Sequence, residues 1–128
     1  MLNVPVIVVK DLRERNNYGP LTGLTKQEAK KKHPLEFEKI SRDKTYHNIN
    51  GSESYEEIKE RVIKVFNTIL AKKYKTIAII SHGGIISTYV REVLTKSKNI
   101  KLGDCAILEI TKEDKKFNLS CLEKAELD

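Results

Sequence analysis

The sequence predicts an α/β fold with a mostly parallel sheet and a carboxyl-terminal antiparallel hairpin. Residues 76–80 are a short apolar run typical of a buried parallel strand, and apolar side chains recur at helical spacing just after it. Residues 58–70 have the apolar periodicity of an amphipathic helix. Residues 105–111 and 116–122 flank a polar turn and predict the hairpin. Alternation of helix and apolar strand is typical of α/β proteins.

The amino-terminal part predicts one strand, one long loop and one short helix. Residues 4–9 are a strand candidate, and residues 11–25 contain several Asn, Gly and Pro breakers. Loops of that length usually carry function. Thr25, with Glu28 three residues later, has capping-box spacing and predicts a helix that ends before Pro34.

The middle of the chain predicts one long helix after an unassigned segment. Residues 34–51 are polar and give no clear pattern. Ser54 and Glu57 repeat the capping-box spacing and predict a helix start. The apolar positions of this helix are Ile58, Val62, Val65, Phe66, Ile69 and Leu70. They lie on one face, which predicts burial of that face.

The most informative turn follows the apolar run 76–80. It places His82 before Gly83 and Gly84 at the start of a predicted helix. The helix is indicated by Ile85, Ile86, Tyr89, Val90, Val93 and Leu94. Ligands of open α/β sheets bind outside the carboxyl ends of strands. The positive end of the helix dipole favours an anion there and disfavours a protonated histidine. The same residues also fit a tight turn with a hydrogen-bonded histidine, and local sequence favours the two interpretations equally.

Composition limits the class of partner. The 128 residues fit one domain, and the formal charge of +6 favours anionic partners. Most lysines are interspersed with acidic residues, and the absence of Trp and of an aromatic-basic ribbon argues against nucleic-acid binding. No apolar run is long enough to span a bilayer and no signal peptide is evident, so we expect no membrane partner and a cytoplasmic location.

Cysteines and carboxylates indicate no metal site. Cys105 and Cys121 lie in the two arms of the predicted hairpin, where we expect reduced thiols with packing roles. They lack the spacing of a zinc site, and no carboxylate cluster has the spacing of metal ligands. We therefore expect neither a metal nor another cofactor.

Three separated segments together resemble the histidine phosphatase superfamily, the phosphoglycerate-mutase-like family. They are residues 12–26, the run Gly51-Ser52-Glu53-Ser54, and Ser81-His82-Gly83-Gly84. One inserted residue separates Gly51 from the Gly-Glu-Ser that is usual in the family. The resemblance implies a three-layer sandwich and a single, partial domain over residues 1–128, which is truncated at the amino terminus relative to the family.

The resemblance also implies roles for individual residues. In the family a histidine of an Arg-His-Gly motif is phosphorylated, a second histidine and arginines hold the phosphoryl group, and a glutamate donates a proton to the leaving oxygen. His82 matches the second histidine and Glu14 the proton donor, which makes these the two candidate catalytic residues. The candidate substrate-binding residues are Arg13, Arg15, Tyr18, Lys26 and Gly83. The alternative for Glu14 is a surface carboxylate beside its two arginine neighbours.

The nucleophile of the family is missing from these residues. The sequence contains no Arg-His-Gly, and neither His33 nor His47 has the context of a nucleophile. The resemblance places the missing strand beside residues 76–80, so we expect an unpaired apolar edge there that favours association. A complementing amino-terminal segment, from another chain or from upstream of Met1, or a homo-oligomer is expected to cover it.

Three functions follow from these observations. The first is a phosphatase-like domain that hydrolyses a small phosphomonoester through a phosphohistidine and is inactive as this chain alone. A mutase-type phosphoryl transfer is the alternative, because residues 18–26 look mutase-like although Gly84 stands where mutases usually have Asn. A non-catalytic module that binds a phosphorylated ligand or a protein is the third.

Overall fold

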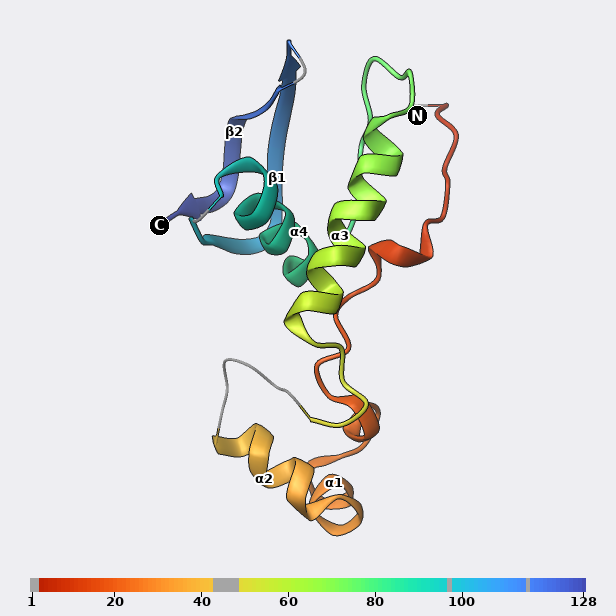
Figure 1. Cartoon of the computed structure of the whole chain (residues 1–128), viewed down its shortest axis with the longest axis vertical. Coiled ribbons are helices and arrows are strands. Elements are labelled where there is room, and N and C mark those ends of the chain that lie inside the picture. Colours follow the sequence, from red (N-terminus) through yellow and green to blue (C-terminus); the bar gives the residue numbers. More distant parts are fainter. Residues whose placement is uncertain (1–2, 43–48, 97, 115) are drawn as a thin grey trace. The chain divides into compact units, whose positions relative to one another are not determined.

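The computed structural model describes residues 3–42, 49–96, 98–114 and 116–128 (Figure 1). The chain divides into two compact units, one made of Met1–Glu14 with Arg61–Asp128 and the other of Arg15–Glu60. Both helices and strands are present, as the α/β prediction requires. None of the helices in these residues is long and apolar enough to cross a membrane. The assignment of residues 1–128 to a single domain stays a prediction.

The unit Arg15–Glu60 is held by two short helices and a small apolar cluster. Helix α1 (Lys26–Lys32) begins with the predicted capping box, in which the Thr25 hydroxyl accepts from the Glu28 amide. Helix α2 (Pro34–Arg42) occupies residues that gave no sequence pattern, and its first residue is a proline, which suits a helix start. The buried cluster is Leu21, Ala29 and Ile49, with Leu24, Phe37 and Ile40 packed against it.

Helix α3 (Tyr55–Leu70) confirms the predicted long helix. The Ser54 amide donates to Glu57 Oε2 at 2.7 Å, and the Glu57 amide donates to Ser54 Oγ at 3.2 Å, so the second capping box is also present. Its buried side chains are Ile58, Val62, Val65 and Phe66. These four belong to the apolar face that the periodicity predicted.

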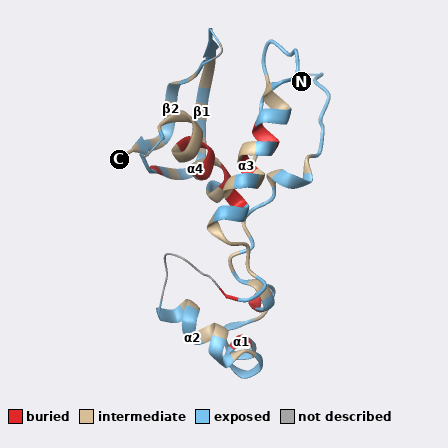
Figure 2. Cartoon of the chain, viewed as in Figure 1, coloured by how far each residue is buried: buried red, intermediate tan, exposed pale blue. Residues whose placement is uncertain are grey.

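The core of the other unit lies where α3 meets the helix after His82. Helix α4 (Gly83–Tyr89) continues as a π-helical segment, η3 (Val90–Leu94). The Phe66 and Tyr89 rings stack with their centroids 3.9 Å apart, and Ile85, Tyr89 and Val90 are buried. Figure 2 shows buried stretches of α3 and α4 in red. Burial raises the pKa of the Tyr89 phenol.

The predicted carboxyl-terminal hairpin is confirmed, with longer strands than expected. Strands β1 (Ile100–Glu113) and β2 (Lys116–Leu127) pair antiparallel, with register shifts at two places along the ladder. Helix α4 contacts β1, and η3 contacts β2. Cys105 and Cys121 are free and exposed, so their predicted packing roles are wrong. A two-stranded ribbon has too little covering structure to bury side chains on both of its faces.

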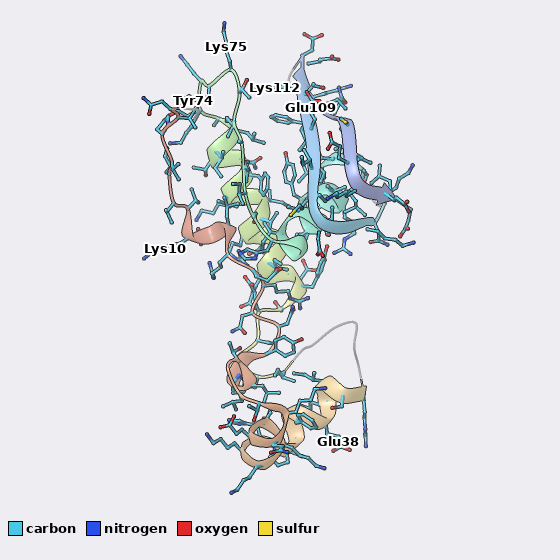
Figure 3. The ribbon with its side chains drawn as sticks, turned by 180° about the vertical axis from the view of Figure 1, so that it is seen from behind. Lys10, Glu38, Tyr74, Lys75, Glu109 and Lys112 are labelled. Atoms are coloured by element: carbon cyan, nitrogen blue, oxygen red, sulfur yellow. The ribbon has the colours of Figure 1, made fainter. Side chains whose placement is uncertain are left out.

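Residues 4–9 and 76–80, both predicted as strands, have no strand partner in the described part of the chain, where the sheet consists of β1 and β2. The predicted burial of residues 76–80 is wrong, because Ile80 is 94% exposed. Val6 and Val8 are each 87% exposed, and Figure 2 draws this segment in the exposed colour. Tyr74, two residues before the second segment, is also exposed (Figure 3). An apolar strand becomes buried only when neighbouring strands and covering helices are present.

Candidate active site

His82 stands at the start of α4, as the sequence predicted. Its backbone is extended, with φ −108° and ψ 160°, and its carbonyl accepts the first helical hydrogen bond, from the Ile86 amide at 3.0 Å. His82 and Gly83 are both exposed. The imidazole is therefore accessible from solvent in the unit that carries it.

The Glu14 carboxylate reaches the turn that His82 begins. Its Oε2 atom accepts a long hydrogen bond, 3.4 Å, from the Gly84 amide, although the two residues are 70 positions apart. A Cβ atom at position 84 would lie 2.5 Å from Glu14 Oε1. Glycine at this position is therefore what leaves room for the carboxylate. Glu14 therefore contacts the turn two residues beyond His82, in the same compact unit.

Backbone anchors hold the segment that precedes Glu14. A 3-10 turn, η1 (Lys10–Leu12), leads into it. Arg61 of α3 donates to two of its carbonyl oxygens, and Ser81 donates to a third. Sequence reasoning missed this role: Arg61 was not singled out, and Ser81 appeared only as part of the segment around His82, because no local pattern indicates a side chain that binds a distant backbone.

Arg13, a candidate phosphate ligand, lies beside Glu14 and pairs with an acidic neighbour. Its Nη1 atom is 3.1 Å from Asp11 Oδ1, and both side chains are more than half exposed. An exposed pair of this kind contributes at most about 1 kcal/mol to stability.

In the other unit, two of the segments that carry the family resemblance are joined. Arg15 Nε donates to the Glu53 carbonyl at 3.0 Å, and the Glu53 amide donates to the Asn16 carbonyl at 2.8 Å. Asn16 Nδ2 also donates to the Gly51 carbonyl at 3.2 Å. Residues 15–16 and residues 51–53 are thus held together within this unit, although they lie more than thirty positions apart.

Asn16 and Gly19 organise this junction, and sequence reasoning treated both only as loop breakers. The Asn16 Oδ1 atom accepts from the Gly19 amide at 2.9 Å and from the Thr22 hydroxyl at 3.2 Å. Gly19 has a φ of +45°, and a Cβ atom there would lie 2.8 Å from backbone atoms of Gly51 and Ser52. The Asn-x-x-Gly spacing is the signal that indicates such an asparagine-closed turn.

The seven candidate site residues divide between the units. Arg13, Glu14, His82 and Gly83 belong to the unit that contains α4. Arg15, Tyr18 and Lys26 belong to the unit that contains α1, where Tyr18 precedes a 3-10 turn, η2 (Gly19–Leu21), and Lys26 is the first residue of α1. Tyr18 is 51% exposed, and Lys26 is exposed as well.

Of the two remaining histidines, the structure describes one. His33 follows the last residue of α1, and its amide donates to the Ala29 carbonyl; His47 lies outside the described residues. In residues 3–42, 49–96, 98–114 and 116–128 no three His, Cys, Asp or Glu side chains form a group that could hold a metal ion. The chemistry of the turn is that of one carboxyl group, one imidazole and backbone amides.

Comparison with known proteins identifies the family. The model of the histidine phosphatase superfamily (branch 1) matches residues 1–124, and so spans both units. No curated protein and no solved structure matches the chain. The resemblance that three short segments indicated is thereby confirmed over nearly the whole length, and the chain belongs to the histidine phosphatase superfamily.

Proposed function

We propose that this chain is the proton-donor and phosphate-binding part of a phosphatase that hydrolyses a small phosphomonoester. One observation carries the proposal: the Glu14 carboxylate lies at the turn that begins with His82, bound to the Gly84 amide at 3.4 Å. The family brings two such groups to a transferring phosphoryl group. Because the chain belongs to the superfamily, we assign Glu14 and His82 to phosphoryl transfer.

The proposed roles follow from the charge that develops during phosphoryl transfer. Negative charge spreads over the phosphoryl oxygens, and cations and N–H donors fixed around them stabilise it. His82, Arg13 and the Gly83 amide are proposed to supply these donors. Glu14 is proposed to protonate the leaving oxygen, a step that typically contributes about 10²–10⁴-fold. The substrate-binding roles that the sequence resemblance implies for Arg15, Tyr18 and Lys26 stay predictions.

The nucleophile has to come from a segment that these 128 residues do not contain, because the sequence has no Arg-His-Gly. Two apolar segments support a docking partner of strand form. Residues 4–9 and 76–80 are without strand partners in the described residues, and Val6, Val8 and Ile80 are almost fully exposed. We propose that a strand that carries Arg-His-Gly, or a second copy of the chain, covers them and completes a parallel sheet in a three-layer sandwich.

Reconstitution tests this function. The chain is mixed with the amino-terminal segment of an intact family member that contains Arg-His-Gly, and hydrolysis of small phosphomonoesters is followed. We expect turnover from the mixture, and loss of about 100-fold or more in Glu14→Gln with an alkyl phosphate. The loss should be much smaller with an aryl phosphate that has a good leaving group, since that oxygen needs no proton. Glu56→Gln, an exposed glutamate of α3, is the matched control.

A non-catalytic module is the second candidate, and the same exposed apolar segments favour it. Saturable phosphate binding without turnover, even in the presence of the Arg-His-Gly segment, selects this function. Phosphoryl transfer from one hydroxyl of a substrate to another, rather than to water, selects the mutase alternative. Equal effects of Glu14→Gln on alkyl and aryl phosphates contradict the proton-donor role.

A further inference from the structure

Three successive carbonyl groups just before Glu14 are bound by side chains from distant parts of the chain. The Asp11 and Arg13 carbonyls accept from Nη1 of Arg61, at 2.6 and 3.1 Å. The Leu12 carbonyl between them accepts from Oγ of Ser81 at 2.8 Å. All of these residues belong to the same compact unit as Glu14.

These bonds determine where the Glu14 side chain starts. A bound carbonyl fixes the orientation of its peptide plane, so three bound in succession leave little freedom in the backbone that enters residue 14. The bonds from Arg61 are charge-assisted and therefore the stronger ones. A planar guanidinium also suits contact with two carbonyls better than a lysine ammonium does.

Ser81 adds a second constraint because it is the residue before His82. Its hydroxyl donates to the Leu12 carbonyl and so links the backbone just before His82 to the backbone just before Glu14. The contact between Glu14 and the Gly84 amide, three residues beyond Ser81, forms within this frame. A side chain held only by its own rotamer preferences would spread over several positions.

We propose that Arg61 and Ser81 are positioning residues, which act through the backbone of residues 11–13 to hold the Glu14 carboxylate at the His82 turn. Neither side chain has to touch substrate for this role. The consequence for catalysis rests on the proposed proton-donor function of Glu14. The geometric claim itself does not depend on turnover.

A spectroscopic cycle on the full chain tests the claim. The Gly84 amide signal is measured by ¹H–¹⁵N NMR with and without Glu14→Ala, first in the native background and then with Arg61→Met. We expect the shift that Glu14→Ala causes to fall by about half or more when Arg61 is replaced. Lys64→Met, an exposed cation of the same helix, is the matched control and should leave the shift intact. An unchanged shift in the Arg61→Met background overturns the role of Arg61.

Ser81→Ala provides a second, milder test that removes a single hydroxyl. It should also reduce the response of Gly84 to Glu14→Ala, while the signals of the Phe66–Tyr89 stack remain native. If Arg61→Met fails to fold, the result with Ser81→Ala decides, and a full response there contradicts the proposal. The NMR experiment does not require turnover, so its result remains valid even if the reconstituted phosphatase is inactive. Conversely, an unchanged Gly84 response refutes the positioning role even if the reconstituted enzyme is active.

Discussion

The polar junction around Asn16 and the apolar segments 4–9 and 76–80 differ in whether the described residues supply their partners. At the junction, side chains and backbone groups of residues 15–19 bind residues 51–53 through several hydrogen bonds. The apolar segments have no strand partners in the described chain, and Val6, Val8 and Ile80 are almost fully exposed.

This difference shows which parts of the fold are self-sufficient. A polar turn is completed by single hydrogen bonds, which a few nearby residues can supply. An apolar strand needs a neighbouring backbone along its length and a second layer over each face. The described residues meet the first need, and we propose that a partner meets the second.

The largest stability effect is expected in the core of the α4 unit. Phe66→Ala removes a buried ring that stacks on Tyr89 at 3.9 Å and should lower the free energy of unfolding by about 3–5 kcal/mol. Val8→Ala, at a position 87% exposed, is the control and should change it by less than about 0.5 kcal/mol. Urea denaturation measures both. A comparable loss in Val8→Ala would show that the apolar segment is already packed.

The next effect is expected at the polar junction. Gly19 and Gly23 both have positive φ, but only a Cβ at Gly19 meets backbone, at 2.8 Å, whereas nothing lies within 4 Å at Gly23. Gly23→Ala should cost about 1–2 kcal/mol from backbone strain alone. Gly19→Ala should cost clearly more, because the Gly51 segment has to move as well. Equal losses of thermal stability in the two variants would contradict the close packing at this junction.

A smaller effect on stability, with a local structural consequence, is expected at the His82 turn. A Cβ at position 84 meets Glu14 Oε1 at 2.5 Å, whereas one at Gly83 meets nothing within 4 Å. Because the carboxylate is the free end of a flexible side chain, Gly84→Ala should displace it and change stability by less than about 1 kcal/mol. The Glu14 side-chain NMR signals should move in Gly84→Ala and stay in place in Gly83→Ala. Identical spectra for the two variants would exclude the contact.

The two capping boxes predict a modest dependence on acidity. Hydrogen bonds from Ser54 hold the pKa of the Glu57 carboxyl below its usual 4.5, and those from Thr25 do the same for the pKa of Glu28. A carboxyl whose pKa is lower in the folded state than in the unfolded state stabilises the fold when the pH is above the unfolded-state pKa. This stabilisation is lost as the pH falls through the folded-state pKa. Helix content should therefore decline below about pH 4.5, and Glu57→Gln should flatten the decline, because Gln can cap without titrating. An unaltered acid profile in Glu57→Gln would argue against the box.

The smallest effect on the isolated chain is expected from a charge on the apolar segment. Ile80 is 94% exposed, so Ile80→Lys should alter the stability of the chain alone by less than about 0.5 kcal/mol. The same change should abolish association with the completing strand, as measured by sedimentation. Association that survives Ile80→Lys would place the docking surface elsewhere.

Sequence patterns that involve neighbouring residues predicted the structure well, whereas patterns whose outcome depends on distant segments did not. Both capping boxes and the hairpin depend on residues close in sequence, and all three formed as expected. The apolar run 76–80 has the composition of a buried strand, yet composition does not specify which strand lies beside it. Its predicted burial was therefore wrong.

The candidate site was predictable only in part for the same reason. Glu14 and His82 emerged from motifs, and the contact of Glu14 with Gly84 places them at one turn. Arg61 and Ser81 bind backbone groups of residues 11–13 that are about fifty to seventy positions away, so no spacing rule identifies them. The Asn-x-x-Gly spacing was a weak signal for the turn at Asn16, but it was interpreted only as part of a loop.

The most direct measurement is hydrolysis of a small phosphomonoester by the chain alone and after addition of the Arg-His-Gly segment. We expect negligible turnover alone, restored turnover in the mixture, and its loss in His82→Ala but not in His33→Ala. Brisk turnover by the chain alone would mean that one of its own histidines is the nucleophile. Restored turnover that is undiminished in His82→Ala would contradict the assignment of the His82 turn to the phosphate.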